Sequence, residues 1–176
     1  MDTVMHHLVI DDQMINQGDV QAIIGPVWWT ANIYEGEERY NDSFGTFSPQ
    51  QRFIFAIMWY VAEVNNGGHD QFYANSTGIV WKDALAGFRE LGIHEAASII
   101  QESADRLGGN PSLDRVARTA QLDMSEPDFS DLDTRYYELE GHLFEVMQQY
   151  IRDHRSAFYF DGIVEIPRRW LEKPSF

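Results

Sequence analysis

The chain is expected to turn sharply at Asn65-Asn66-Gly67-Gly68-His69-Asp70-Gln71-Phe72-Tyr73-Ala74-Asn75-Ser76-Thr77-Gly78. This segment follows residues 53–62, the most apolar run of the sequence, in which no residue is charged. Such a run has no face suited to water, so it predicts a helix that is buried on all sides. Asn and Gly accept the left-handed conformation at helix C-termini, so Asn66-Gly67-Gly68 predicts that the helix stops there. We expect a helix, a tight corner and another helix.

The composition is that of a folded domain. The chain has 176 residues, of which 44% are apolar and 14% aromatic, and this is enough for one domain with a core and too aromatic for disorder. It contains no cysteine, which excludes disulfides and thiolate chemistry. No signal-peptide pattern opens the sequence and no apolar run reaches membrane-spanning length, so we expect a cytoplasmic protein without membrane contact.

The formal net charge is −15, with 28 acidic against 13 basic residues. This excludes ordinary nucleic-acid binding, which requires a positive surface facing the phosphates. It permits a basic protein partner, a cation site, or acidity that serves solubility alone. Eight acids lie in residues 1–50 and eleven in residues 101–150, and these two zones could share one face.

Helical patterns follow one another along the chain. Ser48-Pro49-Gln50-Gln51 has the form of a capping box and predicts the start of the buried helix. Further helices are expected at 79–91, 93–107, 113–122 (capped by Ser112) and 131–154, a strand or arm at 4–10, a loop at 35–47, and a turn or short strand at 158–164. The pattern predicts an all-α, single-domain multi-helix bundle with room for a short terminal strand pair. We divide it into an N-terminal arm and loop region packing on the core (1–47), a helical core (48–155) and a C-terminal tail (156–176).

The last helix carries two kinds of stripe. Its apolar residues recur at the helical period, and they are Leu132, Tyr136, Leu139, Leu143, Met147 and Tyr150. Asp131, Glu138 and Glu145 are seven residues apart and line up away from that stripe, while Asp133 and Glu140 form a second line. Seven residues span about 10 Å of helix, whereas duplex DNA carries a charge every ~1.7 Å of its axis. One helix is therefore too dilute to imitate a phosphate backbone, and other acids must contribute.

A resemblance rests on two motifs. The first is Glu63-x-x-Asn66-Gly67-Gly68-x-x-Gln71-Phe72-Tyr73-x-Asn75-x-x-Gly78, and the second is Phe129-x-x-Leu132-Asp133-x-x-Tyr136-Tyr137. Together they resemble the bacterial DNA-mimic protein family over roughly residues 48–155; His69 stands where the family pattern has an aromatic residue. The resemblance implies a mostly helical fold, no known catalysis, and homodimers that occupy the DNA-binding surface of a transcription factor.

The candidate partner-binding residues are acids of the last helix and of the loops at 123–131 and 35–38: Glu35, Glu37, Glu38, Asp123, Glu126, Asp128, Asp131, Asp133, Glu138, Glu140 and Glu145. The candidate structural motif consists of Asn66, Gly67, Gly68, Gln71, Phe72, Tyr73, Asn75 and Gly78. Asn66 and Asn75 are expected to satisfy backbone groups around the corner.

Catalytic and metal sites receive less support. His69-Asp70 invites a hydrolase interpretation, but adjacent residues of a helical turn point apart and are poorly placed for a mutual hydrogen bond. The six histidines show no ligand spacing, and residues 123–133 lack the calcium-loop pattern. We therefore expect no catalytic residue, no metal and no cofactor.

The leading hypothesis is an acidic, non-enzymatic protein that binds the basic surface of a DNA-binding protein, such as a transcription factor, and competes with DNA. The alternatives are an immunity-type or structural interaction protein whose acidity serves solubility or another partner, and a hydrolase that uses His69 and Asp70. The basic tail at Arg168-Arg169-Trp170 is a candidate contact to a second protomer.

Overall fold

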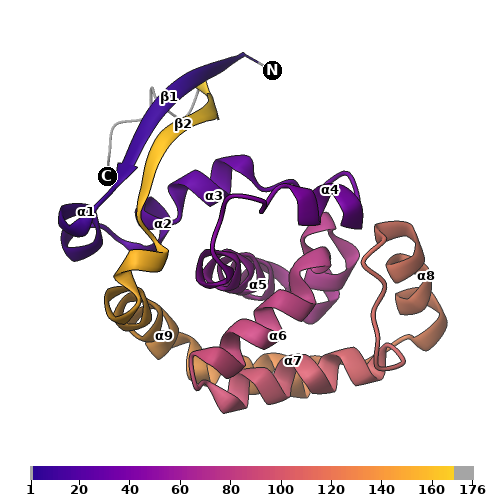
Figure 1. The fold of residues 1–176 in the computed structure, drawn as a ribbon. Coiled ribbons are helices and arrows are strands. Elements are labelled where there is room, and N and C mark those ends of the chain that lie inside the picture. Colours follow the sequence, from indigo (N-terminus) through magenta and orange to yellow (C-terminus); the bar gives the residue numbers. More distant parts are fainter. Residues whose placement is uncertain (1, 169–176) are drawn as a thin grey trace.

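A long helix, α5 (Pro49–Ala74), lies at the centre of the molecule, and the other elements surround it (Figure 1). The computed structural model describes residues 2–168. Along the chain, the remaining elements are β1 (Thr3–Ile10), α1 (Asp12–Gln17), α2 (Val20–Ile23), α3 (Gly25–Thr30), α4 (Glu37–Asp42), η1 (Ser76–Val80), α6 (Trp81–Glu90), α7 (His94–Arg106), α8 (Arg115–Ser125), α9 (Ser130–Asp153), η2 (Arg155–Ala157) and β2 (Phe160–Pro167). The fold is thus mostly α-helical.

The start of α5 is confirmed. The Ser48 hydroxyl accepts a hydrogen bond from the Gln51 backbone N–H at 3.1 Å, and the Gln51 side chain accepts one from the Ser48 N–H at 2.9 Å. This capping box satisfies two N–H groups that the helix itself cannot pair. The side chains that follow are almost completely buried, among them Ile54, Phe55 and Tyr60. Residue 62 is exposed, however, and so are residues 65–67 and 70, so the predicted burial on all sides holds for most of residues 53–62 but not for the whole helix.

The two ends of the described chain form a two-stranded antiparallel sheet. Its register runs from Thr3 opposite Pro167 to Ile10 opposite Phe160. Val164 and Ile166 are buried and β2 packs against α3, which supports a ribbon that would be marginal alone. The predicted multi-helix domain is therefore confirmed as a mostly α-helical fold, and the short terminal strand pair for which the prediction left room is present.

Residues 35–47 were expected to be a loop, but they contain α4. Gly36 adopts φ +89° and allows the chain to enter the helix. Glu37 and Glu38 then occupy the first turn, where acidic groups interact favourably with the helix dipole. The buried Tyr40 fixes the helix by donating its hydroxyl hydrogen to the Asp83 carboxylate at 2.6 Å.

Two boundaries after the corner also differ from expectation. The helix expected at 79–91 begins as the 3₁₀ segment η1 and becomes α-helical from Trp81. The helix expected at 113–122 is α8, and its cap is Asp114, which accepts from the Ala117 N–H at 2.8 Å. Ser112 instead accepts a hydrogen bond from the Asp114 N–H, so it shapes the turn before the helix.

The apolar stripe of α9 is confirmed, since Leu132, Tyr136, Leu143, Met147 and Tyr150 are all buried. Within residues 2–168, no helix combines the length and the apolar character needed to cross a membrane. The divisions at residues 47 and 155 stay predictions. The expected docking residues Arg169 and Trp170 lie outside the described residues.

Candidate interaction site

The corner is a kink inside α5, as its glycines predicted. Gly67 and Gly68 have non-helical backbone angles, and Gly68 adopts φ +70° and ψ −172°, a conformation that is essentially restricted to glycine. A Cβ atom on Gly68 would also strike the Asp133 carboxylate. The side chain that closes the kink therefore comes from α9, 65 residues later in the chain.

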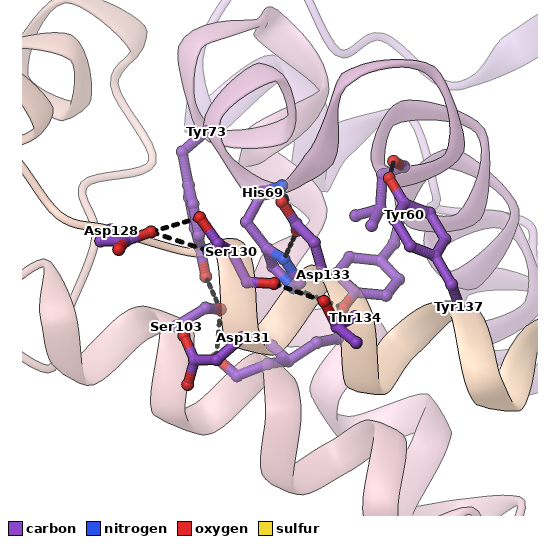
Figure 2. A network of polar contacts seen from close by, with 12 residues as sticks. Tyr60, His69, Tyr73, Ser103, Asp128, Ser130, Asp131, Asp133, Thr134 and Tyr137 are labelled. Atoms are coloured by element: carbon purple, nitrogen blue, oxygen red, sulfur yellow. Dashed lines mark hydrogen bonds and ion pairs between the residues drawn. The ribbon is translucent and has the colours of Figure 1, made fainter.

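Asp133 joins the kink through His69 (Figure 2). Its Oδ1 accepts from the His69 backbone N–H at 3.0 Å and lies 2.5 Å from His69 Nδ1. On the other side of the ring, His69 Nε2 lies 2.7 Å from the Tyr60 hydroxyl. His69 is completely buried and packs against the rings of Tyr60 and Phe129. His69 thus packs as a ring at the motif position where the family pattern has an aromatic residue. Each of its two ring nitrogens also has a hydrogen-bonding partner.

A second carboxylate, Glu63, is enclosed by the corner. It is 9% exposed and accepts hydrogen bonds from the Gln71 amide at 2.7 Å, the Asn75 amide at 2.9 Å and the Thr77 hydroxyl at 2.9 Å. These donors lie on both sides of the junction between α5 and η1. The expected role of Asn75 is corrected, because its side chain binds Glu63 rather than a backbone group. Asn66 likewise donates to the Gln71 side chain.

Arg118 fastens α8 to the same corner. It is completely buried, and its guanidinium donates to the backbone carbonyls of Tyr73, Asn75, Ser112 and Leu113. Burial lowers the pKa of this guanidinium to about 10. Gly78 is required nearby, since a Cβ there would lie 2.5 Å from Arg118 Nε. Arg118 therefore links two carbonyl groups of the corner to two carbonyl groups of the segment before α8, and this fixes the position of α8 relative to α5.

The remaining motif residues are core. Phe72 and Tyr73 are completely buried, and the Tyr73 hydroxyl reaches the Ser103 hydroxyl of α7 at 2.8 Å (Figure 2). All eight candidate structural residues therefore lie at the corner. Sequence reasoning did not assign roles to Tyr60, Glu63 and Arg118. For Arg118 a signal existed, because it precedes Leu122 by four residues on the inner face of α8.

An acidic hollow lies outside the corner, between the end of α5 and α8. Its volume is about 570 Å³, and its lining residues are Asp70, Ala74, Thr119, Leu122, Asp123, Glu126 and Pro127. Arg115 lies at its edge and donates to the Ala74 carbonyl. Burial raises the pKa of the Asp70 carboxyl, and repulsion from Asp133 and Asp128 adds to the shift. The hollow therefore brings together three carboxylates, those of Asp70, Asp123 and Glu126, with no basic residue among its lining residues.

The candidate acids fall into two groups. Some are committed to other groups of the chain: Asp131 to Arg106, Asp133 to His69, Glu140 to Asn65, Asp128 to Ser130, and Glu35 to Arg39. The others make no hydrogen bond or ion pair with any side chain among residues 2–168, and they are Glu37, Glu38, Asp123, Glu126, Glu138 and Glu145. Figure 1 shows α4 and α9 on different sides of α5, so the acids of α4 are not gathered with those of α9.

The hydrolase interpretation named the wrong partner for His69. The carboxylate at its ring is Asp133, and Asp70 points into the hollow instead. His69 and Tyr60 are both completely buried, which leaves no room for a substrate at this ring in the conformation described. In residues 2–168, no three His, Asp or Glu side chains are grouped to hold a metal ion.

Comparison with known proteins gives one finding on family. A family model described as DMP19-like protein matches residues 45–154, which include the corner, α8 and α9. Searches of curated proteins and of solved structures each gave no match.

Proposed function

We propose a function from the premise that the chain belongs to the DMP19-like protein family: it binds the basic surface of a DNA-binding protein and competes there with DNA. The observation that carries the proposal is the acidic hollow with its unpaired carboxylates. A cationic side chain placed in the hollow would stabilise the charged form of Asp70, whose pKa is raised first by burial and then by the charges of Asp133 and Asp128. The proposed activity requires no catalytic group, and we propose a transcription factor as the DNA-binding partner.

The number of negative charges limits how much duplex DNA the chain could imitate. A net charge of −15 equals the phosphates of about seven or eight base pairs. Asp131 and Glu35 are already paired with arginines of the chain, so fewer charges are free to act. A homodimer would present two acidic hollows, as a two-fold DNA-binding protein reads two half-sites about 34 Å apart. We include a homodimer in the proposal for this reason.

The commitment of several acids to internal partners favours a second candidate. If acidity serves solubility or a partner that does not bind DNA, carboxylates need not be spaced like phosphates. Asp131, Asp133 and Glu140 are used to fasten α9 to α5 and α7, which agrees with an immunity-type or structural interaction protein. The two candidates differ in whether DNA displaces the bound partner.

A capture experiment separates them. The full chain is immobilised, incubated at low salt with lysate of its source organism, and eluted with duplex DNA before mass spectrometry. The proposal expects DNA-binding proteins in the duplex eluate, with capture that weakens as salt rises. Partners that remain bound in the presence of duplex would support the second candidate and contradict DNA competition.

A further inference from the structure

Two aromatic side chains lie exposed along one edge of α9. Tyr137 is 48% exposed and Phe144 is 43% exposed, and Gly141 stands between them with open space above it. Their spacing of four and three residues places them in one line along the helix. The Tyr137 hydroxyl donates to the Val64 carbonyl at 3.0 Å, which fixes the ring before any partner arrives. We call Tyr137, Gly141 and Phe144 the aromatic strip.

Carboxylates surround the aromatic strip. Asp133 and Glu140 lie near the Tyr137 ring, and burial followed by these two charges raises the pKa of its hydroxyl. Glu138 and Glu145 lie on the neighbouring edge of the exposed side. No lysine or arginine occurs between Arg135 and Arg152. The strip is therefore an apolar, aromatic line among negatively charged side chains.

We propose that the aromatic strip binds an exposed helix of the basic partner through arginine side chains. The inference rests on the proposed function and names the chemistry of the contact. A planar guanidinium can stack on an aromatic ring while its N–H groups donate to adjacent carboxylates. The ammonium of lysine is compact and strongly hydrated, so it gains less from a ring. Tyr137 and Phe144 are about 10 Å apart along the helix, which matches arginines seven residues apart.

The test compares two synthetic helical peptides that differ in one respect. Both are alanine-based, and they carry either arginine or lysine at the same positions, seven residues apart. Their dissociation constants are measured at low salt against the full native chain and against the Tyr137→Leu/Phe144→Leu variant. The native chain is expected to prefer the arginine peptide by about fivefold. The variant is expected to lose this preference while its affinity for the lysine peptide changes by less than about twofold.

Two control variants sharpen the test. Tyr137→Phe keeps the ring and should keep the preference for arginine. Tyr34→Leu removes a ring that is 75% exposed elsewhere and should also keep it. Equal affinity of the native chain for both peptides, or an unchanged preference in the double variant, would overturn the inference.

A separate arm concerns the proposed function. Asp123→Asn with Glu126→Gln should weaken both peptides equally, because it removes charge from the hollow and leaves the strip intact. If this arm weakens binding but no arginine preference exists, the inference fails and the proposed function stands. If this arm leaves both affinities unchanged, the proposed function itself loses its support.

Discussion

The carboxylates inside the corner, Glu63 and Asp133, differ in their partners from Asp123 and Glu126 of the acidic hollow, which we call the rim acids. Glu63 receives three hydrogen bonds, and Asp133 receives one from the His69 backbone and contacts the His69 ring. Asp123 of α8 and Glu126, which follows the end of α8, line the acidic hollow and bind no side chain among residues 2–168. Buried polar groups must be paired because an unpaired one costs the full desolvation free energy. The interior acids are therefore committed to the fold, whereas the rim acids are free to meet a partner.

The largest expected effect is at Glu63. Glu63→Ala leaves the Gln71, Asn75 and Thr77 donors without their acceptor inside the corner, and it should lower the free energy of unfolding by about 3–5 kcal/mol. Denaturant unfolding measures the change. Glu138→Ala is the matched control, since this exposed acid has no side-chain partner in residues 2–168, and it should shift stability by less than about 0.5 kcal/mol. A similar small loss for both variants would show that the distinction between interior and rim is wrong.

The next effect concerns the kink. Gly68→Ala imposes a strained backbone and brings a methyl group onto Asp133, so it should cost about 2–3 kcal/mol. Gly92→Ala is the control, because Gly92 has a similar φ of +73° with open space around it, and it should cost about 1 kcal/mol. Thermal or chemical unfolding of the pair measures what the backbone conformation of Gly68 and its contact with Asp133 cost beyond an ordinary positive φ. Equal losses would show that neither of these two features adds a cost.

A smaller effect is expected on the rim. Asp123→Asn with Glu126→Gln removes two negative charges near Asp70 and breaks no side-chain contact among the described residues. Stability should stay within about 0.5 kcal/mol of the native chain, with any change toward greater stability at low salt because repulsion is relieved. Calorimetry at low and high salt checks this expectation. A loss above about 1 kcal/mol would assign these carboxylates to the fold instead.

The smallest effect appears in the pH dependence, where Asp70 and Asp131 should act in opposite directions. The raised pKa of Asp70 means that the folded state holds its proton more tightly, so its contribution to stability falls as the pH rises from 3.8 through the raised value. The Arg106 guanidinium lowers the pKa of Asp131 to about 2, so its contribution is present above 3.8 and is lost as the pH falls through about 2. Carboxyl NMR titration measures both. Titration of Asp70 at or below 3.8 would contradict the burial of this carboxyl beside Asp133.

Much of the fold could be predicted from short-range signals. The capping box of α5, the glycine kink and the apolar stripe of α9 are local patterns, and all three are confirmed. The helix α4 was missed because Gly36, Asn41 and Ser43 are typical turn residues, while its stability depends on the contact of Tyr40 with the distant Asp83. The strand pair joins opposite ends of the chain, and its existence could be expected although its register could not.

The site was harder to predict because ion pairing depends on tertiary position. Asp131, Glu138 and Glu145 are equivalent on a helical wheel, yet only Asp131 meets an arginine, Arg106 of α7. Asp133 follows the apolar Leu132, as many surface acids follow an apolar residue. Its carboxylate nevertheless accepts the hydrogen bond of the His69 backbone N–H at the kink of α5. Asp70 was considered as a partner of His69 and instead lines the hollow. The spacing of the acids in the sequence predicts which of them share a helix face. It does not predict which of them lack an ion-pair or hydrogen-bond partner in the folded chain.

We propose that carboxylates without a partner in the chain, rather than the net charge, bind the partner protein. The most direct test uses a DNA-binding protein captured by the native chain and measures its affinity for two variants that each lose two negative charges. One is the rim variant Asp123→Asn/Glu126→Gln, and the other is Glu95→Gln/Asp131→Asn, whose carboxylates are paired with Arg135 and Arg106. We predict a loss of affinity of about tenfold or more for the rim variant and of less than about threefold for the other. Equal losses would contradict it, because they would show that net charge alone decides binding.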